Sequence, residues 1–185
     1  IRRLASEGSR PRLPWSFRLE AVARDPTLTT PILERLRADP ALYVRKSVAN
    51  HLNDFSKDHA QYLVALLRSW GHEHPHTAWI AKHASRTLIK AGNADALALF
   101  DFDSAAMVRV DELVATPRHL ALGETLTVSF SVVSEKKRAQ QLVIDYAIHY
   151  RKANGGTSRK VFKLKELRLE AGASANITKR QRIVD

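Results

Sequence analysis

Apolar and polar residues in the first hundred positions of this 185-residue chain alternate with the period of an α-helix. In residues 42–54 apolar side chains recur every three to four positions, which places them on one helix face. Similar patterns, bounded by Pro, Gly or Ser, predict further helices. They are residues 1–7, the segment between Asp25-Pro26 and Asp39-Pro40, residues 56–70 with Ser56 as N-cap, residues 77–91, and a short turn of helix at 94–100. The first part of the chain is therefore predicted to be helical.

Three of these helices are internal repeats of one another. Residues 44–50 align with residues 80–86 at a shift of 36 and with residues 1–7 at a shift of 43, and each copy combines an apolar residue with basic ones. Repeats of about 40 residues are typical of HEAT-type α-solenoids, in which the second helix of each pair lines a common concave face. We therefore expect Glu7, Asn50 and Arg86 to lie at equivalent heights of one basic face.

After Asp103 the pattern changes to short stretches with the alternation of β-strands. These are residues 107–110, 126–133, 142–150, 160–165 and 175–177, with turns at Gly123-Glu124 and at residues 154–156. We interpret residues 104–185 as an immunoglobulin-like β-sandwich, incomplete at its C-terminus, and residues 1–103 as HEAT-like helical repeats. The predicted fold class is thus a two-domain chain of an α-solenoid followed by a β-sandwich.

Charge adds a preference for anionic partners, since the chain carries +11 at pH 7. Residues 1–103 hold 15 basic and 11 acidic side chains (+4), and residues 104–185 hold 15 and 8 (+7). There is no cysteine, no apolar run of transmembrane length and no secretory signal pattern. We expect a cytoplasmic protein. Because the chain begins with Ile1 in a helical pattern, we also expect a fragment that lacks its natural N-terminus.

Four segments together resemble a known family. They are residues 2–15 (RRLASEGSRPRLPW), 43–54 (YVRKSVANHLND), 57–59 (KDH) and 79–92 (WIAKHASRTLIKAG). This combination is similar to the HEAT-like repeat alkylpurine DNA glycosylases of bacterial DNA alkylation repair, in the AlkC branch. Some members carry a C-terminal immunoglobulin-like domain, which agrees with the second half here. The resemblance covers most of residues 1–100, without the family's earlier repeats, so residues located in those repeats have no counterpart here.

The resemblance implies hydrolysis of the N-glycosidic bond of purines alkylated at N3 or N7, such as 3-methyladenine. Such a base is cationic and leaves readily, so the enzyme has to supply negative charge near an oxocarbenium-like sugar and a positioned water. Glu7 and Asp54 end repeat helices beside basic residues, and we expect them to be the catalytic acids. The alternative is that both are solvated helix-end acids that pair with neighbouring arginines.

The expected partner is double-stranded DNA containing alkylated purines, bound by a monomer without cofactor or metal. Trp15 is a candidate for packing on a sugar or base, the alternative being a core tryptophan. The candidate phosphate contacts are Arg10, Arg12, Arg45, Lys46, Lys82 and Arg86, the alternative being a solvated basic face. Lys136, Lys137 and Arg138 form a basic loop tip that is either a second DNA contact or a soluble hairpin loop.

Two further interpretations remain open at this point. Residues 72–76 (HEHPH) have no ligand partner at zinc spacing, and Pro75 is expected to keep them extended as a surface loop. A non-catalytic HEAT scaffold that binds nucleic acid or an acidic protein through the same basic face is the alternative function. Such a binder has no use for Glu7 and Asp54 on that face.

Overall fold

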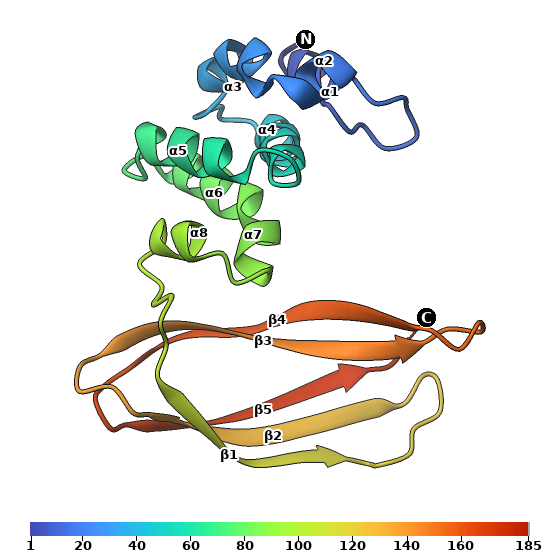
Figure 1. Cartoon of the computed structure of the whole chain (residues 1–185), viewed down its shortest axis with the longest axis vertical. Helices are drawn as coiled ribbons and strands as arrows, with labels where there is room; N and C mark the ends of the chain where they lie inside the picture. Colours follow the sequence, from blue (N-terminus) through green and yellow to red (C-terminus); the bar gives the residue numbers. More distant parts are fainter. Residues whose placement is uncertain (185) are drawn as a thin grey trace. The chain divides into compact units, whose positions relative to one another are not determined.

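The computed structural model describes residues 1–184 and divides the chain into two compact units, residues 1–100 and 101–185. The first unit is helical and the second is built from β-strands (Figure 1). This division lies three residues before the expected boundary at 103/104, because Asp103 belongs to the second unit. Its N–H donates to the carbonyl of Gln141, and its carboxylate pairs with Lys136.

The helical unit contains two rows of short helices. In one row α4 (Leu42–Phe55) packs against both α1 (Arg2–Gly8) and α6 (Pro75–Ala84), and α7 (Arg86–Lys90) continues from α6. The second row contains α3 (Thr30–Arg35), α5 (Ala60–Trp70) and α8 (Ala94–Ala98), with α2 (Glu20–Arg24) and the 3₁₀ helix η1 (Pro26–Leu28) leading into it (Figure 1). The three internal repeats are therefore confirmed as neighbouring elements, α1, α4 and α6–α7.

One apolar core joins the rows. Its largest fully buried side chains include Leu33, Leu52, Phe55, Leu67 and Ile80, which come from α3, α4, α5 and α6. The apolar face of α4 thus packs as its sequence pattern predicts.

Several predicted helix boundaries are wrong. Ser56 is not the N-cap of α5: it ends α4, where its hydroxyl donates to the carbonyl of Asn53, and α5 begins at Ala60. The helix predicted after Asp25-Pro26 is divided into η1 and α3, and the one predicted at 77–91 is interrupted at Ser85. Pro75 is the first residue of α6, with His74 as its N-cap, and so does not keep the segment extended.

The second unit is a sandwich of two antiparallel sheets. One sheet has the order β1 (Val108–Thr116), β2 (Thr125–Ser134), β5 (Ser174–Arg182), and the other pairs β3 (Gln140–Arg151) with β4 (Thr157–Leu169). Val132, Leu142, Leu169 and Ile177 form its core. The turn expected at Asn154-Gly155 joins β3 to β4, and Gly155 adopts a φ of 80° there, which glycine tolerates best. The predicted β-sandwich is therefore present.

Candidate active site

Glu7 and Asp54 converge on one guanidinium group, that of Arg10. Nη1 of Arg10 donates to Oε1 of Glu7 at 2.7 Å. Nε and Nη2 of Arg10 donate to Oδ2 and Oδ1 of Asp54 at 2.9 and 3.3 Å. Arg10 is only 7% exposed, so this three-residue cluster, which we call the acid clamp, is largely removed from water. The structure thus brings together the two acids that lie 47 positions apart in the sequence.

The packing of α1 against α4 produces this geometry. Glu7 lies in the last turn of α1, Arg10 follows directly after that helix, and Asp54 lies in the last turn of α4. Ser47, two turns before Asp54 on α4, donates its hydroxyl to Oε2 of Glu7 at 2.6 Å. Both oxygens of Glu7 therefore have a fixed donor, which is Arg10 for Oε1 and Ser47 of α4 for Oε2.

The electrostatic environment keeps Glu7 ionised. Burial raises its pKa, but hydrogen bonds from Ser47 and Arg10, together with the charges of Arg10 and Arg3, outweigh burial and lower the pKa below its usual value. For Arg10 burial opposes the charged form, and the bonds to Asp54 and Glu7 raise its pKa all the same. At neutral pH Glu7 is a carboxylate, which excludes it as a general acid and suits it to stabilise positive charge.

A second arginine lies close to the acid clamp. Arg86, at the start of α7, donates from Nη1 to the carbonyl of His83 and from Nη2 to Oδ1 of Asn50. Burial lowers the pKa of Arg86, the charge of Asp54 opposes this effect and the charge of Arg10 adds to it. Of the three residues expected at equivalent heights of one face, Glu7 thus belongs to the acid clamp, Arg86 lies within electrostatic reach of it, and Asn50 binds Arg86.

Arg10, one of the candidate phosphate contacts, is placed differently from the prediction. It is buried, and its guanidinium is bound by two carboxylates. Its contact with a phosphate stays a prediction, because sequence alone does not show that the chain folds Arg10 back between α1 and α4.

The other basic candidates differ in how accessible they are. Nη2 of Arg12 donates to both carboxylate oxygens of Asp58, and Nη1 of Arg45 donates to the carbonyls of Asp39 and Pro40. Nζ of Lys82 lies 5.7 Å from the ring centre of Phe100. Lys46 is exposed on α4, and its charge contributes to lowering the pKa of His83, whose largest cause is burial. Lys46 is thus the most accessible cation of the predicted set.

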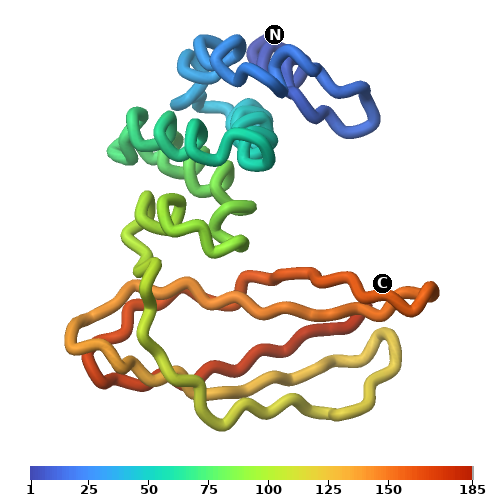
Figure 2. The backbone as a smooth tube through the Cα atoms, in the orientation of Figure 1, coloured from blue at the N-terminus to red at the C-terminus, as the bar shows by residue number. Residues whose placement is uncertain are grey.

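Trp15 is not a core tryptophan. It is 105% exposed and has a φ of 63°. It belongs to the segment between α1 and α2, which Figure 2 shows as an extended loop. The N–H of Leu19 donates to the carbonyl of Pro11 at the base of this loop, and Asp58 pairs with Arg12 and Arg18. A braced loop therefore holds an aromatic side chain out in solvent, close in sequence to the acid clamp.

Sequence reasoning missed three residues of the site. Ser47 binds Glu7, and Arg3 lies 3.9 Å from Oε2 of Glu7 while its guanidinium covers the ring of Tyr43 at 4.4 Å. His51 is fully buried, and its Nδ1 is 2.9 Å from the carbonyl oxygen of Ser6, the residue before Glu7. The position of His51 one turn after Val48, on the apolar face of its helix, was the available signal.

Metal binding finds no support within residues 1–184. No group of three or more His, Cys, Asp or Glu side chains in this range could hold a metal ion. In the segment 72–76 the ring of His72 stacks on Phe100 with centroids 5.3 Å apart, and Nδ1 of His74 accepts the N–H of His76 as a helix cap. These contacts give the two histidines structural roles.

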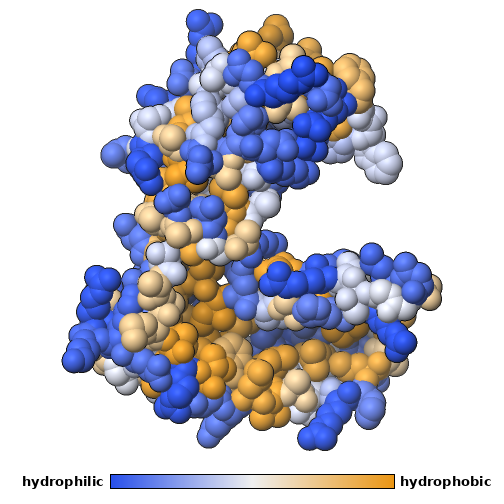
Figure 3. All heavy atoms as spheres, in the orientation of Figure 1, coloured by the Kyte–Doolittle hydropathy of each residue, from blue (hydrophilic) through white to orange (hydrophobic). Residues whose placement is uncertain are grey.

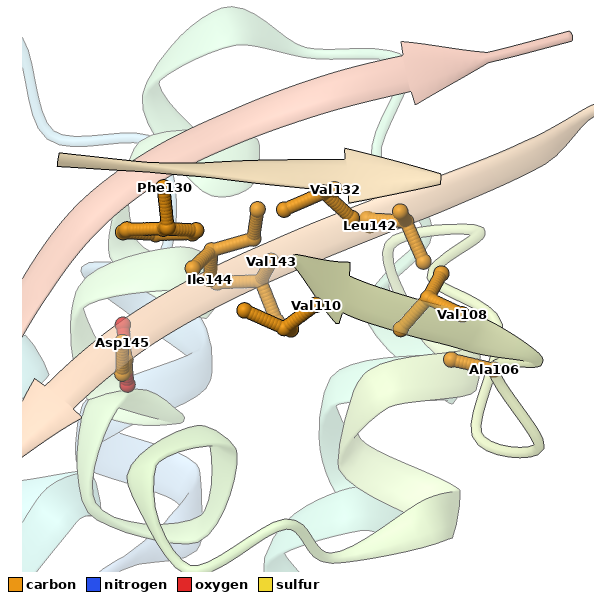
Figure 4. Close-up of a pocket in the computed structure, with 9 residues that line it drawn as sticks. All are labelled: Ala106, Val108, Val110, Phe130, Val132, Leu142, Val143, Ile144 and Asp145. Atoms are coloured by element: carbon orange, nitrogen blue, oxygen red, sulfur yellow. The ribbon is translucent and has the colours of Figure 1, made fainter. Parts of the chain in front are cut away.

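The β unit offers a basic loop and one small cavity. Lys136 binds Asp103 at 2.6 Å and is 11% exposed, whereas the side chain of Arg138 is 78% exposed, so the three basic residues of the loop tip are not equivalent. A cavity of about 240 Å³ opens between the sheets (Figure 4), lined by apolar side chains of β1, β2 and β3 and by Asp145. Ligand pockets usually exceed about 300 Å³ and hold several polar groups. This cavity is smaller, and Asp145 is the polar side chain among those that line it.

Comparison with known proteins relates both units to the same relatives. The family model described as "Uncharacterised protein YhaZ, C-terminal Ig-like domain" matches residues 109–185. The "Uncharacterized protein YhaZ" of Bacillus subtilis (strain 168) is 46% identical over 185 residues, which are 100% of this chain and 51% of that protein. In the part of the chain that the structure describes, no helix is long and apolar enough to cross a membrane.

A solved structure matches both the fold and the sequence. It is Pseudomonas fluorescens alkylpurine DNA glycosylase AlkC bound to DNA containing an abasic site analog, with 54% identity and a TM-score of 0.93 over 100% of this chain and 51% of that chain. The chain thus spans about half the length of these relatives. The predicted resemblance to the AlkC branch is confirmed: along its whole length the chain is a homologue of AlkC and of YhaZ, and its second unit is an Ig-like domain.

Proposed function

We propose that the protein is an alkylpurine DNA glycosylase, which hydrolyses the N-glycosidic bond of purines alkylated at N3 or N7. The observation that carries this proposal is the acid clamp, in which Glu7 and Asp54 share Arg10 in a chain 54% identical to AlkC. Double-stranded DNA containing such bases is the proposed partner. We place the enzyme in the cytoplasm, as a monomer that needs no cofactor.

The proposed chemistry uses fixed negative charge. An alkylated purine carries a positive charge and needs little help to leave, so the barrier lies in the developing charge on the sugar. Glu7, with its side chain 17% exposed against 8% for Asp54, is the more accessible acid and is our candidate for facing C1′. Because Ser47 and Arg10 fix its carboxylate before substrate arrives, little reorganisation is needed in the transition state.

The DNA would be held by the cations around the acid clamp. Lys46, Arg86, Arg45, Lys82 and Arg12 are the proposed contacts to phosphates, with Lys46 the most exposed of them. Trp15, on its braced loop, is proposed to stack on a base or sugar, an interaction that contributes about 1–3 kcal/mol.

The direct test is release of 3-methyladenine from methylated DNA by the intact protein. We expect Glu7→Gln and Asp54→Asn to lower the single-turnover rate by about 100-fold or more, as is typical when one charge-stabilising group is removed from an active site. Glu34→Gln and Asp95→Asn, which change exposed acids of α3 and α8 in the same way, serve as matched controls and should keep the wild-type rate.

Two outcomes would contradict the proposal. Full activity of both clamp variants would show that Glu7 and Asp54 are structural partners of Arg10 and not catalytic residues. A wild-type protein that releases no base, yet binds DNA with a steep salt dependence, would establish the non-catalytic scaffold.

A further inference from the structure

His51 is a buried titratable group that the proposed chemistry does not use. Its side chain is fully buried in α4 and contacts two other segments. Nδ1 lies 2.9 Å from the carbonyl oxygen of Ser6 in α1, and Nε2 lies 3.2 Å from the hydroxyl of Thr29, the residue before α3. One imidazole therefore connects three segments, and the residue after Ser6 is Glu7.

The partners of His51 determine its protonation state. A carbonyl oxygen only accepts hydrogen bonds, so Nδ1 must carry the proton that is donated to Ser6. Nε2 is then free to accept the hydroxyl of Thr29. Burial is the largest cause that lowers the pKa of His51, to about 4, and the ring is neutral at pH 7. His51 is thus a fixed, uncharged donor to the backbone of α1.

Helix α1 depends on such polar contacts for its position. Ser6 is its only buried residue, and Ile1 and Leu4 are exposed at 106% and 72%. Within the described residues, α1 contacts α4 through Arg3 with Tyr43, Glu7 with Ser47 and Ser6 with His51, and Arg2 binds Asp39 in the loop before α4. The bond from His51 is the one of these that binds the backbone of α1, directly before the acid.

We propose that His51 is a positioning residue of the acid clamp: its Nδ1–H holds the carbonyl of Ser6 and so fixes Glu7 at the distance from Asp54 at which both bind Arg10. His51 acts through Glu7 and does not contact DNA. This inference rests on the proposed glycosylase activity for its kinetic consequence, but the geometric part stands independently of that activity.

The test replaces His51 by residues that differ in one property. His51→Asn keeps an N–H close to the position of Nδ1, whereas His51→Leu removes the donor at similar size. His51→Gln places its amide at the position of Nε2, and is the second variant without a donor to Ser6 should the leucine variant fail to fold. Thr29→Val is the matched control, because it removes the partner of Nε2 and leaves that of Nδ1.

Two measurements separate positioning from a purely structural role. The first is the pKa of the Glu7 carboxyl in the 185-residue chain, followed by carbon NMR. The second is the single-turnover rate of 3-methyladenine release by the intact folded protein. We expect His51→Leu and His51→Gln to raise the pKa of Glu7 towards its ordinary value and to lower the rate by about 10- to 100-fold, the effect of a small misplacement of a catalytic group. His51→Asn and Thr29→Val should stay within about 2-fold of the wild-type rate, well below the effect that misplacement produces.

The outcomes distinguish this inference from the proposed function. If the wild type releases no base, the glycosylase proposal fails, and the pKa of Glu7 in the variants still decides whether His51 positions it. If the leucine and glutamine variants only melt at lower temperature, while the Glu7 pKa and the rate per folded molecule are unchanged, His51 is a core residue and the positioning role is wrong. Equal behaviour of the asparagine and glutamine variants would also overturn it.

Discussion

Among single residues, Arg10 is the buried cation on which two carboxylates of the helical unit converge. Replacing it by Met would remove the one buried cation that both Glu7 and Asp54 bind. Breaking a buried ion pair in this way usually costs about 3–5 kcal/mol, and we expect the free energy of unfolding to fall by that amount. Urea denaturation of Arg10→Met measures it.

The matched control is Arg12→Met, two residues further along the chain. Arg12 also binds a carboxylate bidentately, but its partner Asp58 has a side chain 33% exposed, and solvent screens the pair. Exposed ion pairs contribute about 0–1 kcal/mol, so this variant should lose no more than that. Equal losses for the two variants would show that burial does not set the strength of the acid clamp.

His51 gives the helical unit a predictable dependence on acid. Its pKa is about 4 in the folded protein, against 6.5 for the free side chain. Between these values the unfolded chain binds a proton that the folded chain does not, so stability is complete above pH 6.5 and decreases as the pH falls towards 4. The loss is up to about 3 kcal/mol, since one pKa unit corresponds to about 1.4 kcal/mol.

Urea denaturation between pH 7.5 and pH 4.5 measures this loss. His51→Asn removes the contribution of this histidine and leaves that of His83, whose pKa burial also lowers, so the curve of the variant should be flatter than that of the wild type. Glu7 and Asp39, whose pKa values are lowered in the fold, add their own loss of stability only as the pH falls towards and below their ordinary values of 4.5 and 3.8. An equal slope in both proteins would contradict the assignment to His51.

At the scale of elements, the sequence predicted long periodic helices better than short or interrupted ones. Residues 42–54 coincide with α4 (Leu42–Phe55), since four apolar turns give a clear signal. Helix α2 (Glu20–Arg24) was missed because five residues show no periodicity, and Ser85 interrupts a segment whose pattern is continuous. Ser56 is typical of both helix ends, and only the bond to Asn53 shows which one it serves.

The candidate site was predictable where it depends on periodic helices. The repeat placed Glu7, Asn50 and Arg86 on corresponding helices, and in the structure Glu7 belongs to the acid clamp while Arg86 lies near it and binds Asn50. The roles of Arg10, Ser47 and His51 could not be predicted, because each depends on how closely α1 packs on α4. Such a distance is a property of tertiary packing that no local pattern records.

In the loop between α1 and α2, Trp15 is expected to lower the stability of the fold and to strengthen the binding of DNA. Trp15 buries no surface, and its left-handed backbone costs a residue other than glycine about 1 kcal/mol or more. We expect Trp15→Gly to melt at the same or a higher temperature, while the free energy of binding to DNA weakens by about 1–3 kcal/mol. Differential scanning calorimetry and fluorescence anisotropy measure the two effects. Trp15→Phe, which keeps an aromatic ring, should retain most of the affinity, and a lower melting temperature for the glycine variant would show that Trp15 packs on the fold.

For the whole molecule, the relevant property is a positive charge that extends over both units. The helical unit and the β unit each carry a net positive charge, and apolar and charged side chains mix over the visible surface (Figure 3). Each phosphate contact adds about 1 to the slope of the binding constant against salt concentration on logarithmic scales. The salt dependence of binding therefore reports which units contact DNA, without knowledge of how they are arranged.

The loop between β2 and β3 allows the contribution of the β unit to be measured. Lys136 is held by Asp103, whereas Lys137 and Arg138 project into solvent, although Arg138 also lies 3.7 Å from Asp103. If this loop contacts DNA, the double variant Lys137→Ala, Arg138→Ala should lower the salt slope by about 2, because two phosphate contacts are lost. Lys136→Ala, the matched control, should leave the slope unchanged and lower the stability of the β unit, since it breaks a half-buried ion pair. An unchanged slope in the double variant would show that the loop is a soluble hairpin connection without contact to DNA. Lys46→Ala in α4, compared with Arg68→Ala in α5, would then test whether the helical unit alone binds DNA.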